Sequence, residues 1–190
     1  VVRGGAPNEN SYFLDGIKIP AINHFSVQGA SGGPNGLVNL AFLQGMELYS
    51  SAFPANYPSG LSSLMDLRQR DGRNDRLGAR VTLGYSDFGV TLEGPLTKKS
   101  NFIASARTSF SQYLLKPSNV PVLPAYNDIQ FRNKWRLDDK NALIITGIAG
   151  FDNYWLNTDA PESDALLYNV GYIPEGKQNV YAYGANSRHF

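Results

Sequence analysis

The second half of the chain alternates between apolar and polar residues over segments of about ten residues. In the first of these segments Gly78, Arg80 and Thr82 are small or polar, and the residues on either side of them are mostly apolar. Successive side chains of a strand point to opposite faces of its sheet, so this period of two predicts a strand with one apolar and one polar face. Several such segments joined by polar turns are typical of a membrane-spanning barrel, and a soluble antiparallel sheet with one wet face gives the same alternation.

Six strands of this kind are predicted after Asp71. Their ranges are Leu77–Tyr85, Phe88–Leu96, Phe102–Tyr113, Ile129–Leu137, Ala142–Phe151 and Asn179–Phe190. The connections Gly94–Asn101 and Asp138–Asn141 are short and charged, whereas those at Lys116–Ala125 and Asp152–Gln178 are longer. Outer-membrane barrels show this asymmetry, with short turns on the periplasmic side and long loops outside.

The polar face of the third and fourth predicted strands is basic. It carries Arg107, Arg132, Lys134 and Arg136, and the apolar face of the same strands includes Phe110, Phe131 and Trp135. In a barrel the basic side chains would point into a wet lumen, and the aromatic ones would face lipid or the membrane interface. The fifth predicted strand is apolar on both faces, so its pattern does not assign an inner face.

Residues 1–71 follow a different pattern, in which short apolar runs are separated by glycine-rich turns. Strands are predicted at Ser11–Ile19 and Met46–Tyr49, and a short helix is predicted around Leu37–Leu43. The result is a small α+β unit with little regular hydrophobic face of its own. Asp71 and Asp75, at the end of this unit, are predicted to be solvated turn residues.

Composition narrows the function classes. The chain has 190 residues, no cysteine and a formal net charge of +1, which excludes a disulfide scaffold and gives no electrostatic footprint for nucleic acid. No run approaches the roughly 18 apolar residues of a transmembrane helix, so only strands could cross a membrane. The chain starts at Val1 and a strand-like pattern still continues at Phe190, so we expect a piece of a longer protein.

The sequence does not favour an enzyme. Residues 29–33 formally match the G-x-S-x-G nucleophile elbow around Ser31, but the strand that should precede this serine is short. The only two histidines, His24 and His189, lie far apart in sequence, and no metal-binding spacing is present. We therefore predict no enzymatic activity, no metal site and no cofactor.

Five motifs resemble those of TonB-dependent outer-membrane receptors, particularly the SusC-like type of Bacteroidetes. They are Val2–Gly5 with Phe13–Ile17, then Gly45–Tyr49, Phe53–Tyr57, Gly60–Leu67 and Leu92–Leu96, in the family's order. The resemblance implies a mainly β fold, in which a partial α+β plug domain is followed by antiparallel strands of a transmembrane β-barrel. Residues 1–72 would be the C-terminal part of the plug, and residues 77–190 the first six strands of an incomplete barrel.

The same resemblance implies a function. Such a receptor lies in the outer membrane of a Gram-negative cell and imports a nutrient, here a glycan, a peptide or a metal chelate. Its barrel of about 22 strands is closed by the plug, and the energy is relayed by TonB, through a segment upstream of Val1. The implied partners are TonB, outer-membrane lipid, the nutrient and a lid lipoprotein, without nucleic acid.

The resemblance also implies site residues, because ligand contacts in this family come from the plug apex and the external loops. The candidates are His24, Phe25, Gln28 and Ser31 on the plug, with Tyr126, Tyr154, Trp155 and Asn157 on the barrel wall. Each of these side chains is also suited to ordering a loop. Arg3 matches a plug arginine that pairs with wall carboxylates, while Ser50 and Ser51 stand where a second arginine is common. The alternative function is a soluble secreted β-sandwich that binds glycans through aromatic loops.

Overall fold

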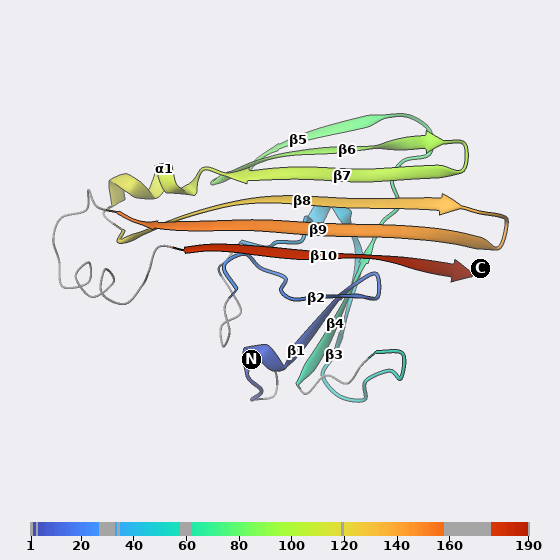
Figure 1. Ribbon diagram of the computed structural model, residues 1–190, viewed down its shortest axis with the longest axis horizontal. Helices are drawn as coiled ribbons and strands as arrows, with labels where there is room; N and C mark the ends of the chain where they lie inside the picture. Colours follow the sequence, from blue (N-terminus) through green and yellow to red (C-terminus); the bar gives the residue numbers. More distant parts are fainter. Residues whose placement is uncertain are drawn as a thin grey trace.

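The computed structural model describes residues 2, 4–26, 33, 35–57, 62–118, 120–157 and 176–189. It contains a four-stranded sheet of order β2-β1-β4-β3 and a six-stranded sheet of order β10-β9-β8-β7-β6-β5. Figure 1 shows the long strands of the six-stranded sheet running side by side, with the four-stranded sheet at one face. Within the described ranges, no helix has the length and apolar character needed to cross a membrane.

The four-stranded sheet and its loops form the N-terminal module, residues 4–71. Its elements are η1 (Pro7–Glu9), β1 (Asn10–Leu14), β2 (Ile17–Ile19), η2 (Leu40–Phe42), β3 (Leu43–Tyr49) and β4 (Ser63–Gln69). The predicted continuous strand Ser11–Ile19 is wrong, because Asp15 and Gly16 have φ values of 50° and 80° and turn the chain into a hairpin. The predicted helix at Leu37–Leu43 is only the single 3₁₀ turn η2.

The six-stranded sheet is antiparallel, and its strands pair in chain order. They are β5 (Gly78–Leu83), β6 (Asp87–Thr97), β7 (Ser100–Ser109), β8 (Val122–Arg136), β9 (Asn141–Leu156) and β10 (Gly176–His189), with α1 (Ser111–Leu115) and η3 (Lys116–Ser118) between β7 and β8. All six predicted strands are therefore confirmed, with corrected ends.

Two of these corrections have local causes. The third predicted strand stops at Ser109, whose Oγ accepts a hydrogen bond of 3.2 Å from the backbone N–H of Ser111 and starts the turn into α1. The fourth begins earlier than predicted, at Val122, although the strand contains Pro124. Pairing with β7 reaches only to Asn127, so Pro124 lies where one side of β8 is unpaired, a position at which strands tolerate proline.

The two faces of the six-stranded sheet differ as the alternation predicts. On β8 the side chains of Asp128, Gln130 and Arg132 are buried against the N-terminal module, whereas those of Ile129 and Phe131 point outward and are exposed. The outer face carries further exposed apolar side chains on other strands, among them Val81, Leu92, Ile145, Tyr181 and Tyr183. A soluble sandwich would bury this apolar face against a second sheet. Here the buried face is instead the polar one.

The main hydrophobic core joins the two sheets. Leu14, Leu37 and Leu67 of the N-terminal module pack against Ile148 of β9 and Val180 of β10. This contact explains why β9 is apolar on both faces: its inner face meets the module's core instead of water. Gly150 of β9 leaves room for the approach, because a Cβ there would lie 2.7 Å from Cδ1 of Leu37.

Gly72 fixes the path of the chain between the two sheets, which gives a first prediction. It is buried, and a Cβ at this position would overlap the backbone carbonyl of Phe102 on β7. Gly72→Ala should therefore push the linker away from β7 and lower the free energy of unfolding of the full-length protein by about 1 to 3 kcal/mol. Gly45→Ala is the matched control, because a Cβ on Gly45 meets nothing within 4 Å. Equal denaturation midpoints for the two variants would contradict this account of the linker.

Candidate functional site

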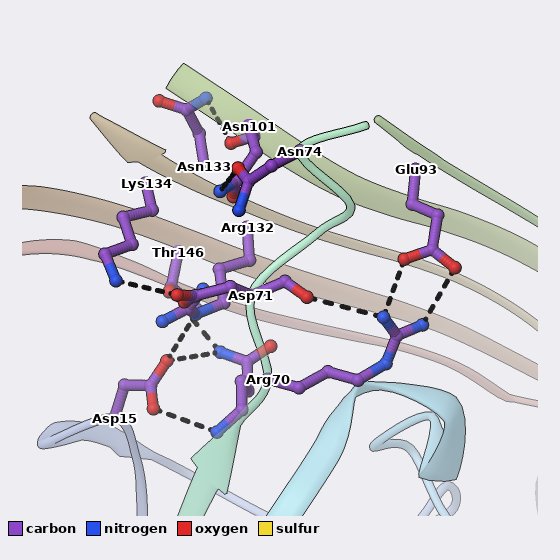
Figure 2. A network of polar contacts seen from close by, with 11 residues as sticks. Asp15, Arg70, Asp71, Asn74, Glu93, Asn101, Arg132, Asn133, Lys134 and Thr146 are labelled. Carbon is purple, nitrogen blue, oxygen red and sulfur yellow. Dashed lines mark hydrogen bonds and ion pairs between the residues drawn. The ribbon is translucent and has the colours of Figure 1, made fainter. Parts of the chain in front are cut away.

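A polar network connects the N-terminal module to the inner face of the six-stranded sheet (Figure 2). We call it the central network, and its members are Asp15, Gln69, Asp71, Gln130, Arg132, Lys134 and Thr146. Asp15 lies in the β1–β2 turn, and Gln69 and Asp71 lie at the end of β4 and just after it. The other members lie on β8 and β9. The alternation of those strands aims their polar side chains at the module.

Arg132 is the centre of this network. Its Nε lies 2.9 Å from Oδ2 of Asp15, and its Nη1 lies 2.6 Å from Oδ1 of Asp71. Lys134 Nζ reaches the other oxygen of Asp71 at 2.7 Å. The side chain of Arg132 is only 1% exposed, so its charge depends on these two carboxylates for compensation.

Two glutamines extend the network. Gln69 Nε2 donates to Oδ2 of Asp15 at 3.1 Å and to Oγ1 of Thr146 at 3.3 Å. Gln130 Nε2 donates to Oε1 of Gln69 at 2.8 Å, and its own Oε1 accepts from the backbone N–H of Asn39 at 2.9 Å. These uncharged groups fix the register of the module on β8 and β9.

A separate ion pair joins the module to β6. Arg70 donates from Nη1 and Nη2 to the carboxylate of Glu93 at 2.6 and 3.2 Å, and its Nε donates to the carbonyl of Ala41 at 2.7 Å. In this pair the arginine belongs to the module and the carboxylate belongs to the six-stranded sheet, which is the arrangement expected for Arg3. In the central network the charges are reversed, because the carboxylates belong to the module and the basic side chains belong to the six-stranded sheet. Arg3 itself lies outside the described residues.

The interpretation of Asp71 as a solvated turn residue is wrong. Burial alone would raise the pKa of Asp71, but hydrogen bonds from Lys134 and Arg132 outweigh it and hold that pKa below its ordinary value. The stabilisation is therefore present above the pKa of the unfolded chain and is lost as the pH falls through the folded value. Asp75, by contrast, is exposed and pairs with Arg73 at 2.9 Å.

A second contact, the His24 cluster, consists of His24, Arg107, Tyr126, Asp128 and Asp152. His24 is 1% exposed, and its Nδ1 and Nε2 lie 2.6 Å from Asp152 and 3.2 Å from Asp128. The ring of Tyr126 stacks on it with centroids 4.1 Å apart. Among the described side chains, no group of three or more histidines and carboxylates is arranged to hold a metal ion.

The structure brings some of the predicted site residues together and separates others. His24, Phe25 and Tyr126 are in contact, but His24 and Tyr126 are buried where the two sheets meet. Asn157, past the end of β9, is 1% exposed and donates to the carbonyl of Lys116. The remaining wall candidates lie near the end of β9, and Trp155 is 39% exposed. Two of the plug candidates, Gln28 and Ser31, lie outside the described residues.

A cavity of about 300 Å³ lies at the same end of the sheet as the His24 cluster, and its lining is mostly apolar. Phe25 and Asn35 line it from the N-terminal module, and the opposite lining includes Tyr85, Leu114 and Pro124. The sequence indicates Phe25 as a contact residue. It does not indicate the other lining residues, because the α1 turn and the β5–β6 connection carry no chemical motif.

The fold is shared with known receptors. No family model and no curated protein matches the chain. The siderophore receptor PirA from Acinetobacter baumannii is similar over 97% of this chain and 30% of its own, with 15% identity and a TM-score of 0.65. The R480A mutant of the ferric enterobactin receptor PfeA from Pseudomonas aeruginosa is similar over 96% of this chain and 31% of its own, with 14% identity and a TM-score of 0.62.

A third similar structure is the ferripyoverdine receptor of the outer membrane of Pseudomonas aeruginosa. The similarity extends over 99% of this chain and 26% of that receptor, with 15% identity and a TM-score of 0.60. The chain thus spans about a third or less of each of these proteins. All three are receptors and not enzymes. At these identities the likeness shows the fold, mainly β with a partial plug and antiparallel barrel strands.

Proposed function

We propose that this chain is part of a TonB-dependent outer-membrane receptor that imports a nutrient with energy relayed by TonB. Residues 1–72 would be the C-terminal part of its plug, and residues 77–190 the first six strands of its barrel. The observation that carries the proposal is the arrangement of the six-stranded sheet, whose apolar face is exposed and whose polar face is buried against the module. We call this arrangement the inverted sheet. A soluble protein rarely exposes such a large apolar surface, whereas a barrel wall needs it.

The substrate class we propose is a metal chelate. The similar structures support it, because their names identify receptors for siderophores, ferric enterobactin and ferripyoverdine. The aromatic side chains of Phe25 and Tyr85, in the cavity near the predicted plug apex, are suited to stacking on an aromatic or other apolar part of a chelate. A SusC-like type with a lid lipoprotein and a glycan or peptide substrate remains a prediction.

The central network suits a plug that has to be held and then moved. Asp15 and Asp71 hold the module to Arg132 and Lys134 by ion pairs between separate sheets, so displacing the module need not break a strand. A pull by TonB on the upstream part of the plug would have to separate these pairs or slide the module past them. The network is therefore the element we expect to resist that pull.

Fractionation of cells that produce the full-length protein tests the location. We expect the protein in the outer membrane, released only by detergent, and migrating differently on gels before and after heating, as a folded barrel does. Release with the soluble periplasm would contradict the receptor proposal and favour the secreted glycan-binding sandwich. Growth of a deletion strain on a panel of iron chelates, glycans and peptides then tests the substrate class, and a defect confined to glycans would overturn the chelate assignment.

A further inference from the structure

The base of one loop of the N-terminal module is fastened to the barrel wall from both of its sides. The loop leaves at Asn23 and returns at Gly36, which form an isolated β-bridge. His24 closes the base with its backbone, since its N–H donates to Asn35 and its carbonyl accepts from Gly33, each at 2.9 Å. We call residues 22–26, 33 and 35–37 the loop base.

Three wall side chains hold this loop base. Asp152 of β9 accepts from the ring of His24 and, through its other oxygen, from the backbone N–H of Phe25 at 2.6 Å. Asp128 of β8 accepts from the other ring nitrogen of His24. Arg107 of β7 donates to the carbonyls of Gly36 and Leu37, and also to Asp128 at 2.8 Å. The departing and returning segments are therefore both held, and His24 is the residue of the loop base that contacts two of the three wall side chains.

The geometry fixes the protonation state of His24. Both of its ring nitrogens face carboxylate oxygens, which only accept hydrogen bonds when ionised, whereas a neutral imidazole has a single N–H. Two such contacts need both nitrogens protonated. The imidazolium and Arg107 then balance Asp128 and Asp152. Among the described residues, Tyr126 is the other titratable neighbour in contact with His24, and it donates its hydroxyl to Asp87 of β6 at 2.7 Å.

We propose that His24 is a positioning residue, and that its imidazolium holds the loop base, and with it Phe25 at the nutrient-facing cavity, against Asp128 and Asp152. The proposal rests on the proposed function for the meaning of the cavity. The backbone conformation of Phe25 requires contacts that stabilise it. Its φ is 58°, a left-handed conformation that a phenylalanine rarely adopts, and its N–H is held by Asp152.

Deprotonation should loosen the loop base. Burial alone would lower the pKa of His24, but the hydrogen bonds to Asp128 and Asp152 and their charges together raise it above its ordinary value. The contribution of His24 is then fully present below the unfolded pKa of about 6.5 and is lost as the pH rises through the folded pKa. Between these values the factor by which His24 favours the closed loop base over the open one should fall about tenfold for each pH unit.

Hydrogen exchange measured by mass spectrometry on the purified full-length protein tests this inference. The readout is the protection of three amides of the loop base, those of His24, Gly33 and Leu37, after correction for the intrinsic pH dependence of exchange. In the wild type we expect constant protection up to about pH 6.5, followed by about a tenfold loss for each pH unit until the folded pKa of His24 is reached. His24→Gln should give low protection at every pH, and His189→Gln, which alters an exposed histidine, should match the wild type.

Asp152→Asn provides a second variant should His24→Gln fail to assemble. It keeps the shape of the side chain but removes one of the two charges that favour the imidazolium, so the folded pKa of His24 should fall. The loss of protection should then still begin near pH 6.5 but end at a lower pH than in the wild type. Wild-type protection that stays constant up to pH 9, or an Asp152→Asn profile identical to it, would overturn the positioning role. Because exchange needs no ligand and no transport, this failure is distinct from a failure of the receptor proposal, which fractionation decides.

Discussion

Arg132→Met should lower the free energy of unfolding of the full-length protein by about 3 to 5 kcal/mol, the range for breaking a buried ion pair by removing one partner. Methionine keeps most of the side-chain volume but offers no charge to Asp15, which is 4% exposed, or to Asp71. Asp15 would retain its hydrogen bonds from the backbone and side chain of Gln69. These bonds satisfy its oxygens without neutralising its charge, so most of the loss should remain.

Denaturant unfolding monitored by tryptophan fluorescence measures this loss. Arg136→Met is the matched control, because it makes the same change on the same strand at an exposed position, where we expect an effect within about 0.5 kcal/mol. Combining Arg132→Met with Asp15→Asn should recover part of the stability, since it removes the uncompensated charge and keeps an amide in the turn. Similar losses for the Arg132 and Arg136 variants would show that the central network does not hold the module.

The alternation of side chains was sufficient to predict the strands and most of their faces. On β7 and β8 it separates Arg107 and Arg132 from Phe102 and Phe131, because one face meets a polar partner and the other faces outward. It failed on β9, since the partner of Ile148 there is the module's hydrophobic core. A pattern within one strand cannot reveal what that strand packs against.

The contacts between the sheets were harder to predict than the strands. Asp71 directly precedes a Gly-Arg-Asn-Asp sequence that is typical of a solvated turn, and its pairing with Arg132 depends on how the module docks. Asp128 was detectable in principle, because it shares the parity of Gln130 and Arg132 on the polar face. Asp152 was assigned to a loop, since the sequence gives no signal that β9 continues to Leu156. The sequence indicated His24 as one of only two histidines, but the carboxylates that it contacts, Asp128 and Asp152, lie more than a hundred residues away along the chain.

The fastening points lie along the inner face of β8 and explain how a small module is held by a wall. In chain order along the middle of the strand, Asp128 contacts His24, Gln130 contacts Gln69 and Asn39, and Arg132 contacts Asp15 and Asp71. A single strand thus contacts three parts of the module that are distant in sequence. These contacts of β8 are all polar, and they add specificity to the hydrophobic contact between the module and Ile148 and Val180 of β9 and β10.

Ile129→Lys should impair assembly in the outer membrane, because it places a charge on the outer face near the middle of β8 (Val122–Arg136). Ile129 is 53% exposed, and in the proposed barrel its side chain would contact lipid close to the bilayer midplane. A lysine at that depth costs about 2 to 4 kcal/mol, whereas near the membrane interface the cost falls to about 0 to 1 kcal/mol. Trp135→Lys, at the end of the same strand and on the same face, is therefore the depth control.

The amount of heat-modifiable, folded protein in purified outer membranes is the measurement for both variants. We expect a clear loss for Ile129→Lys and a near-normal amount for Trp135→Lys, since only depth distinguishes the two sites. If the outer face of the sheet were instead in water, lysine would be tolerated at Ile129 because the side chain is already exposed there. Normal assembly of Ile129→Lys would then show that this face does not meet a bilayer, and the inverted sheet would need another explanation.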